Sequence, residues 1–376
     1  MEIVNLFFIV IFVFYTLFIG LLIYGFSKVQ AFVSLDMKSK TSFSIVVPFR
    51  NEEKNLPELL QSFIQLNYPK DLFEIILVDD ASNDNAVSII KEWKTENPSF
   101  DLTVVNNVRS SNSPKKDAIT SAILMAKYDW IITTDADCSV RENWLSVFNH
   151  YIQNHSVEMI AGGVNYSIQK GLLSHFQQMD LLSLQGATIG SFGLNKAFMC
   201  NGANFAYSKK TFHDLNGFEG NNAIASGDDV FLLQKVVSKF PEKVHYLKSE
   251  EAIVTTKTEE SWLSLFYQRV RWASKAGAYD SVFSKGLAVV VFLANLSLVL
   301  GLFLILTNVL NWKFLLMLFL VKFVFDFILM YKTNRFLRMC MHSVVVSSLL
   351  YPFFSSGVAL YSLVGSYKWK ERRFKK

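Results

Sequence analysis

Two aspartates, Asp135 and Asp137, stand one residue apart directly after the apolar run 130–134. A carboxylate at the end of a buried strand is costly unless a cation or an opposite charge lies beside it. Two hard oxygen ligands in this place suit a divalent metal, Mn²⁺ or Mg²⁺, that is itself bridged to a diphosphate. Because Asp-x-Asp pairs also cap turns, the interpretation depends on the residues that accompany this one.

The elements that would position these aspartates alternate in type. Four apolar runs typical of strands lie at 44–47, 75–78, 102–105 and 130–133. They are separated by three patterns typical of helices, at 53–66, 84–93 and 115–127. Continuous apolar strands separated by helices predict βαβ units and a parallel sheet covered on both faces. We therefore expect a doubly wound α/β fold, in which ligands bind outside the carboxyl ends of the strands.

Polar residues follow each expected strand. They are Arg50, Asn51 and Glu52 after the first, where Pro48 precedes them, Asp79 and Asp80 after the second, Lys115 and Lys116 after the third, and Asp135 and Asp137 after the fourth. Any one set could serve a turn, as Asn83 and Asp84 are expected to do. Because the fold brings all four strand ends to one crevice, the combined set predicts a functional site.

Further segments continue the pattern downstream. The ordered set is 44–48 (SIVVP) with Asn51 and Glu52, 78–82 (VDDAS), 134–137 (TDAD), 201–207 (NGANFAY), 226–229 (SGDD) and 268–272 (QRVRW). Together these motifs, over about residues 43–275, resemble the family 2 glycosyltransferases with the GT-A fold. Two departures are Asp228, where the family more often has Glu, and Pro114, where Gly often precedes the lysine. Neither departure removes a functional group.

The resemblance implies an inverting, single-displacement transfer of a sugar from a nucleotide sugar, a UDP-sugar above all. By the same resemblance, Asp80 contacts the nucleobase. Pro48, Arg50 and Glu52 are implied to line the nucleobase pocket.

The diphosphate side of the site has a separate set of expected residues. Asp137 would hold the metal, with Asp135 directed toward the ribose or the metal, and the metal would stabilise the charge on the leaving group. Lys115 is the expected point charge near the phosphates. Lys116 is an equal candidate from the sequence alone.

Asp228 and Asp229 open an expected helix at 230–235. Acids in a first helical turn commonly compensate the helix dipole. Two adjacent carboxylates also raise one another's pKa, which suits a general base. With the family resemblance we favour Asp229 as the base for the acceptor hydroxyl, with Asp228 beside it.

The composition is too apolar for an ordinary soluble enzyme, with 51% hydrophobic, 15% aromatic and only 18% charged residues. Long apolar runs predict transmembrane segments. The expected organisation is a transmembrane helix at 3–27, a GT-A domain at 43–258, an amphipathic interface helix at 259–281, transmembrane helices at 286–310 and 314–331, a transmembrane or re-entrant segment at 343–366 and a basic tail at 367–376.

Basic residues set the expected orientation. Lys28, Lys38 and Lys40 follow the first span, and Lys332, Arg335 and Arg338 follow the third. The positive-inside rule then places the catalytic domain in the cytoplasm, on a cell inner membrane. The tail conflicts with this if 343–366 is a single span, whereas a break at Pro352 would return it inside. The sequence leaves both open.

The basic tail also explains the net charge of +5, because its six positive and one negative charges sum to +5 and the rest of the chain to zero. We therefore expect contact with anionic lipid headgroups and no nucleic-acid partner. The scattered cysteines Cys138, Cys200 and Cys340 fit a reducing cytoplasm.

Three apolar segments have more than one interpretation. In the interface helix, Gln268 and Arg271 share a polar side, and with Trp272 they are expected to face the acceptor and diphosphate while the other side packs at the bilayer. The run 172–184 suits core packing or the border of an acceptor-lipid groove.

Lys322 and Asp326 each cost about 2.5–3.5 kcal/mol inside a span, so we expect them to pair. A role in placing a lipid headgroup is the alternative.

The favoured function is transfer of a single sugar to a membrane lipid or lipid-linked acceptor of the cell envelope. The QxxRW motif with one helix before and three segments after the domain resembles ceramide glucosyltransferase-like proteins. A processive polysaccharide synthase is the first alternative, although four membrane segments are few for a polymer channel. A silent membrane scaffold or lipid-binding protein is the second. The scaffold interpretation is disfavoured because all four candidate aspartates are present, namely Asp80, Asp135, Asp137 and Asp229.

Overall fold

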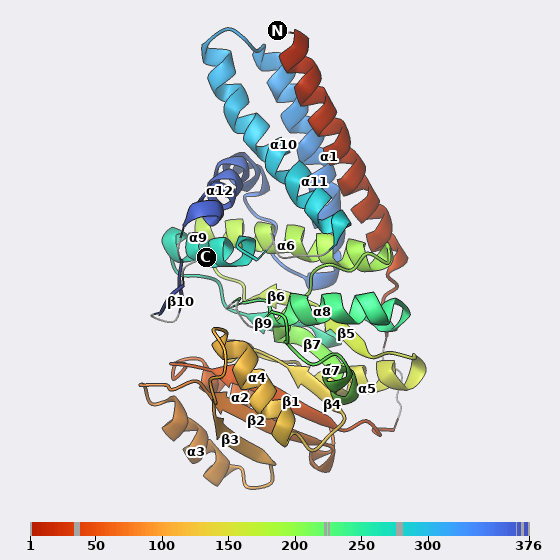
Figure 1. Cartoon of the computed structure of the whole chain (residues 1–376), viewed down its shortest axis with the longest axis vertical. Coiled ribbons are helices and arrows are strands. Elements are labelled where there is room, and N and C mark those ends of the chain that lie inside the picture. Colours follow the sequence, from red (N-terminus) through yellow and green to blue (C-terminus); the bar gives the residue numbers. More distant parts are fainter. Residues whose placement is uncertain are drawn as a thin grey trace. The chain divides into compact units, whose positions relative to one another are not determined.

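The computed structural model describes residues 2–33, 38–221, 224, 226–275 and 281–365, and the backbone of 367–369 and 372–374. It divides into two compact units (Figure 1). The sheet unit consists of residues 30–167 and 199–257, and the helical unit of residues 1–29, 168–198 and 258–376. The segment 168–198 therefore packs with the helical unit, although it lies inside the range expected to form one GT-A domain.

The sheet unit is built on a seven-stranded sheet of order β3-β2-β1-β4-β7-β5-β8. The strands β1 to β4 are parallel to one another, β7 runs antiparallel to both β4 and β5, and β8 is parallel to β5. The bounds are Phe43–Phe49 (β1), Phe73–Asp79 (β2), Leu102–Asn106 (β3), Trp130–Thr133 (β4), Met159–Gly162 (β5), Phe205–Ser208 (β7) and Val244–Leu247 (β8). This mostly parallel, doubly wound sheet confirms the predicted fold class.

Helices cover the sheet because its central strands are apolar on both faces. Every residue of β2 is buried, and in β1 all but Pro48 are. The covering helices are Leu56–Ile64 (α2), Ala86–Glu96 (α3), Pro114–Met125 (α4), Trp144–Asn154 (α5), Lys209–Asp214 (α7) and Asp228–Lys239 (α8), and a small parallel pair joins Val164–Tyr166 (β6) to Val254–Thr256 (β9). The first three lie within three residues of the expected positions.

The helical unit contains six helices among the described residues. They are Glu2–Lys28 (α1), Leu172–Gly193 (α6), Trp262–Ala273 (α9), Val282–Leu306 (α10), Trp312–Leu337 (α11) and Val344–Val364 (α12), and the backbone strands Tyr367–Trp369 (β10) and Arg372–Phe374 (β11) pair antiparallel after them. The side chains of the basic tail, and residues 276–280 of the expected interface helix, lie outside the described residues.

Glycines explain why α6 packs with α1. A Cβ added to Gly190 would lie 2.4 Å from the Leu22 carbonyl oxygen, and one added to Gly25 would lie 2.1 Å from the Gly190 carbonyl oxygen. Two helices can approach this closely only where neither carries a side chain. The run 172–184 thus begins a helix that packs inside the helical unit, as the core-packing interpretation expects.

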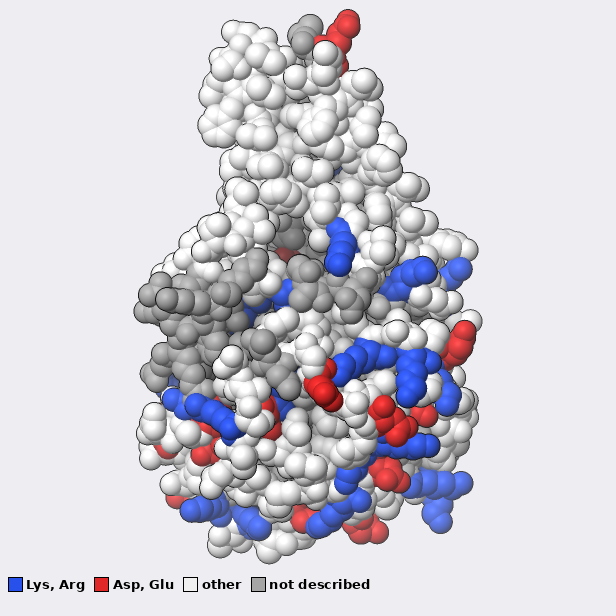
Figure 2. Space-filling model, viewed as in Figure 1, with Lys and Arg blue, Asp and Glu red and all other residues white. Residues whose placement is uncertain are grey.

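Four helices, α1, α10, α11 and α12, are long and apolar enough to cross a membrane. Their arrangement of one before and three after the sheet unit's sequence is the predicted layout. The part of these helices visible in Figure 2 carries hardly any charged residues. The α12 helix continues through Pro352, as transmembrane helices tolerate, so its backbone has no break of the kind a re-entrant hairpin requires there.

Candidate active site at the carboxyl ends of the strands

The Asp135–Asp137 motif lies just beyond the end of β4. Asp135 accepts a hydrogen bond from the Lys115 ammonium at 2.7 Å, and the Cys138 thiol donates to Asp137 at 3.6 Å. Burial, with the carboxylates of Asp137 and Asp135 nearby, holds the pKa of Cys138 well above its usual value. The raised pKa favours the protonated thiol, which leaves the two carboxylates as the ready ligands of the motif.

The donor set fits a hard divalent cation that takes part of its coordination from a ligand. In the part of the chain that the structure describes, no three His, Cys, Asp or Glu side chains form a metal cluster. Asp135 and Asp137 would supply two oxygens, and Mn²⁺ or Mg²⁺ held this way would need further oxygens from phosphates or water. The chemistry of the residues thus fits the expected metal.

The structure separates the two neighbouring lysines. The Lys115 ammonium lies 2.7 Å from Asp135 and 3.3 Å from Asp228. Lys116 points elsewhere, because its ammonium donates to the carbonyls of Asn221 (2.7 Å) and Ile224 (2.9 Å). Of the two candidates for the phosphate-side charge, Lys115 is the one that lies among the aspartates.

Lys115 is a fixed positive charge. Burial alone would lower its pKa, but Asp135 and Asp228 more than offset this and raise the pKa of Lys115 above its usual value. The ammonium therefore links the metal-type motif after β4 to the acidic pair at the start of α8.

Asp229 is held by main-chain donors. One carboxylate oxygen accepts from the Gly202 amide (3.1 Å) and the other from the Val230 amide (2.7 Å). Gly202 belongs to the 201–207 segment, and a Cβ there would lie 3.0 Å from the Asp228 carboxylate, which is why a glycine suits this position. Asp229, the expected base, therefore contacts the expected acceptor-side segment 201–207.

Asn204, in the same segment, fixes its backbone. Its side chain is fully buried, accepts from the Trp144 indole (3.0 Å) and donates to the carbonyls of Gly163 (2.8 Å) and Ala252 (2.7 Å). A buried amide with all of these bonds made is a rigid support. The segment is thereby held against β5 and the loop before β9.

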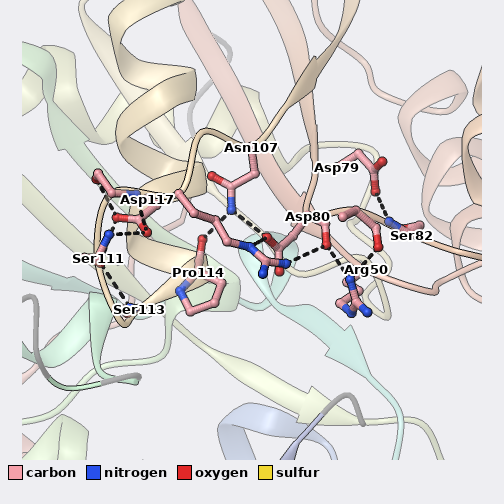
Figure 3. Close-up of polar contacts among 12 residues, drawn as sticks. Arg50, Asp79, Asp80, Ser82, Asn107, Ser111, Ser113, Pro114 and Asp117 are labelled. Atoms are coloured by element: carbon pink, nitrogen blue, oxygen red, sulfur yellow. Dashed lines mark hydrogen bonds and ion pairs between the residues drawn. The ribbon is translucent and has the colours of Figure 1, made fainter. Parts of the chain in front are cut away.

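Asp80 forms a second polar cluster, at the ends of β2 and β3 (Figure 3). Its Oδ1 accepts from Arg109 Nε at 2.7 Å and from Asn107 at 2.8 Å. Arg50, one of the expected pocket residues, donates to the main-chain carbonyls of Asp80 (2.7 Å) and Ala81. One guanidinium group thus contacts the Asp80 carboxylate, and a second contacts its main-chain carbonyl.

Arg109 and Asn107 were not among the predicted site residues. Both follow β3 directly, and the β2–β3 register pairs Asp79 with Asn106, so position after a strand was the signal that could have identified them. The other expected pocket residues lie on β1 and just after it. Pro48 is part of β1, and buried Glu52 accepts from the Asn55 side chain at 2.6 Å near the start of α2.

Gln268, Arg271 and Trp272 lie on α9, in the helical unit. The helix begins with a capping box formed by Ser261 and Ser264. The Gln268 amide donates to Glu259 at 2.6 Å. These three residues are half-buried, whereas the other expected site residues belong to the sheet unit.

The polar centre of α9 is Arg269, which was not among the predicted site residues. It is buried, pairs with Asp180 of α6 at 2.5 Å and also bonds the Gln268 side chain. Its guanidinium lies 4.2 Å from the centre of the Trp272 ring. Arg269 therefore positions two residues of the QxxRW motif and joins α9 to α6.

Comparisons with known proteins identify relatives in sequence and in fold. Residues 44–215 match the model described as glycosyl transferase family 2. The chain is 26% identical over 244 residues to the probable glycosyltransferase YdaM of Bacillus subtilis (strain 168), covering 63% of this chain and 56% of YdaM. It is 25% identical over 264 residues to a poly-beta-1,6-N-acetyl-D-glucosamine synthase of Staphylococcus epidermidis, covering 68% and 60% of the two chains. It thus spans less than two thirds of the length of these relatives.

One solved structure shares the fold over nearly the whole chain. It is the mannosyltransferase PcManGT from Pyrobaculum calidifontis in complex with GDP-Man and Mn²⁺, at a TM-score of 0.61 and 15% identity. The match covers 94% of this chain and 98% of that one. The likeness shows a common fold, including helices outside the sheet unit.

Proposed function

Because residues 44–215 make this chain a member of glycosyl transferase family 2 with the GT-A fold, we propose that it is an inverting membrane glycosyltransferase. It transfers a single sugar from a nucleotide sugar to a membrane lipid or lipid-linked acceptor. The observation that carries this proposal is the position of Lys115, within 3.3 Å of both Asp135 and Asp228. That contact supports one site shared by the donor-side motif and the acidic pair.

The nucleobase would bind at Asp80. A carboxylate accepts from a ring N–H, and the guanidinium groups of Arg109 and Arg50 can donate to the adjacent carbonyl. Uracil and guanine both present an N–H beside a carbonyl, so the cluster supports a UDP- or GDP-sugar, and we favour UDP. The structural neighbour PcManGT was solved with GDP-Man.

Asp137 and Asp135 would hold Mn²⁺ or Mg²⁺, which when bound neutralises the charge of the diphosphate. PcManGT was solved with Mn²⁺. Lys115 adds a fixed positive charge on the same side, and its ammonium stabilises the leaving phosphate. Together these residues favour departure of the nucleoside diphosphate.

Asp229 accepts the proton of the acceptor hydroxyl. The hydroxyl oxygen attacks the anomeric carbon from the face opposite the diphosphate, the proton passes to the Asp229 carboxylate, and the bond from sugar to phosphate breaks. The amides of Gly202 and Val230 keep the carboxylate in place. One base suffices for this single displacement.

The four apolar helices support a location in a membrane, and by the positive-inside rule the basic residues that flank α1 and α11 favour a cytoplasmic sheet unit. A cell inner membrane fits this orientation. Gln268, Arg271 and Trp272 on α9 would contact the acceptor or the diphosphate. A lipid acceptor follows from the proposed location.

The test is glycosylation of lipids by the purified full chain in nanodiscs. A panel of labelled nucleotide sugars is offered with Mn²⁺, and labelled lipids are identified by mass spectrometry, with Asp229→Asn as the inactive control. We expect one labelled lipid class carrying one sugar per molecule. Labelling of a soluble acceptor at the same rate, or labelling by Asp229→Asn at the wild-type rate, would refute the proposal.

A processive polysaccharide synthase is the second candidate. It is favoured by the 25% identity over 264 residues to a poly-beta-1,6-N-acetyl-D-glucosamine synthase. The same assay distinguishes the two. A ladder of products longer than one sugar indicates the synthase.

A further inference from the structure

The helical unit contains a pocket that the proposed reaction does not use. It has a volume of about 30 Å³, enough for about two water molecules or one small polar group. The helix α6 contributes Asp180, α11 contributes Lys322 and Asp326, and α12 contributes Ser347. Ser183 of α6, Ser348 of α12 and the aromatic and methionine side chains of the same helices complete the walls.

The charges of the pocket are already balanced. Lys322 pairs with Asp326 at 2.5 Å, and Asp326 also accepts from the Tyr15 hydroxyl at 2.5 Å. Asp180 pairs with Arg269 at 2.5 Å. Two carboxylates and one ammonium line the pocket, so the charged groups of its lining are mainly hydrogen-bond acceptors. A phosphate group would meet no surplus positive charge here.

Ser347 is the independent sign of a ligand. Its side chain is 2% exposed, and its hydroxyl has no hydrogen-bond partner among the described residues. A buried hydroxyl without a partner is destabilising, and native structures rarely leave one unsatisfied. A hydroxyl group in the pocket could bond both Ser347 and the carboxylate of Asp326, whose oxygens each have two acceptor sites.

Two of the helices that line the pocket also carry exposed apolar side chains. On α11, Val324 is 50% exposed, and on α12, Leu349 and Phe353 are 52% and 51% exposed. These side chains belong to helices apolar enough to cross a membrane. A molecule with a hydroxyl in the pocket can therefore extend along apolar helix faces.

We propose that the pocket between α6, α11 and α12 binds the hydroxyl-bearing end of one uncharged membrane lipid, of the diacylglycerol type. The hydrocarbon chains of this lipid lie against the outer faces of α11 and α12. The inference rests on the membrane location given under the proposed function and adds the class of lipid that the helical unit binds. The transfer reaction itself is not part of it.

The experiment uses the full chain in phosphatidylcholine nanodiscs that contain a photoactivatable diacylglycerol. After irradiation, labelled peptides are identified by mass spectrometry. We expect labelling of α11 and α12, competed by unlabelled diacylglycerol and not by phosphatidic acid with the same chains. Equal competition by phosphatidic acid would overturn the assignment of an uncharged head.

A matched pair of substitutions tests the site. Ser347→Ala and Ser356→Ala each remove a buried α12 hydroxyl that has no hydrogen-bond partner among the described residues, but only Ser347 lines the pocket. We expect Ser347→Ala to reduce labelling about five-fold, as loss of one neutral hydrogen bond predicts, and Ser347→Leu to abolish it by filling the space. Ser356→Ala should label as the wild type does. Equal labelling of both alanine variants would overturn the site.

Nucleotide binding in the presence of Mn²⁺ separates this inference from the proposed function. If specific lipid labelling fails while the chain still binds nucleotide with Mn²⁺, the lipid site is wrong and the glycosyltransferase proposal stands. If labelling behaves as expected while nucleotide binding fails, the lipid site stands and the proposed function is wrong. Retained nucleotide binding by Ser347→Leu also shows that this variant is folded.

Discussion

Lys115→Met removes an ammonium that lies 2.7 Å from Asp135 and 3.3 Å from Asp228. The substitution preserves most of the length and volume of the side chain. It leaves the two carboxylates without this cation, beside the carboxylate of Asp229. We expect it to have opposite effects on metal binding and on turnover.

The magnitude follows from the geometry. At 2.7 Å, an effective dielectric constant of ~20 gives an attraction of about 6 kcal/mol between unit charges. Desolvation cancels most of this, and the Asp135 side chain is 36% exposed, so the net effect is far smaller. A net loss of about 1.4 to 2.8 kcal/mol corresponds to about a ten- to hundred-fold change in an equilibrium constant.

In the absence of nucleotide, Lys115 competes with a metal for Asp135. Lys115→Met should therefore bind Mn²⁺ about ten-fold or more tightly than the wild type, measured by titration calorimetry or by the Mn²⁺ paramagnetic resonance signal. Turnover should fall at the same time, because the leaving diphosphate loses a fixed positive charge. Tighter metal binding together with slower transfer is a result that simple unfolding does not produce.

Lys116→Met is the matched control. Lys116 is buried and adjacent in sequence, but it bonds the carbonyls of Asn221 and Ile224. It should lower thermal stability and leave Mn²⁺ affinity without nucleotide unchanged. Unchanged Mn²⁺ affinity in Lys115→Met, or an equal rise in both variants, would refute the electrostatic reasoning.

Three further substitutions test other parts of the site and the fold. Asp229→Asn should reduce turnover by about 10²–10⁴-fold with little change in nucleotide affinity, and a silent Asp229→Asn beside an inactive Asp228→Asn would move the base to Asp228. Arg109→Ala should weaken nucleotide binding by about ten-fold in calorimetry, since a charged hydrogen bond at Asp80 is worth about 1.5–3 kcal/mol; unchanged affinity would exclude Arg109 from the nucleobase site. Burial lowers the pKa of His245, so His245 binds a proton less readily in the folded state than in the unfolded state. The stability that neutral His245 contributes is therefore lost as the pH falls below about 6.5 toward the lower pKa of the folded state. His245→Asn should flatten this acid-side decline in the melting temperature, and an identical pH profile would contradict that assignment.

Local patterns in the sequence determined much of the architecture. The apolar runs of β1 to β4 and the polar residues after them predicted the parallel half of the sheet and its ligand-binding edge, because burial on both faces requires such runs. The four long apolar segments predicted α1, α10, α11 and α12 for a similar reason. Both features depend on residues that are close together in the chain.

Tertiary packing decided what adjacent residues do. Lys115 and Lys116 are equivalent in the sequence, but successive positions on a helix point about 100° apart, so α4 directs one ammonium to Asp135 and the other to the loop before α8. Arg109 reaches Asp80 only because β3 lies beside β2. Such contacts join residues far apart in sequence, and no local pattern encodes them.

Tertiary packing also decided to which unit residues 168–198 belong. The sequence placed this segment inside the GT-A block, since it lies between two parts of that block. Its glycines allow α6 to pack at backbone contact with α1, and the buried pair Asp180–Arg269 joins it to α9. The sequence alone determined that an apolar helix would form here, whereas the shapes and charges of distant partners decided which unit it completes.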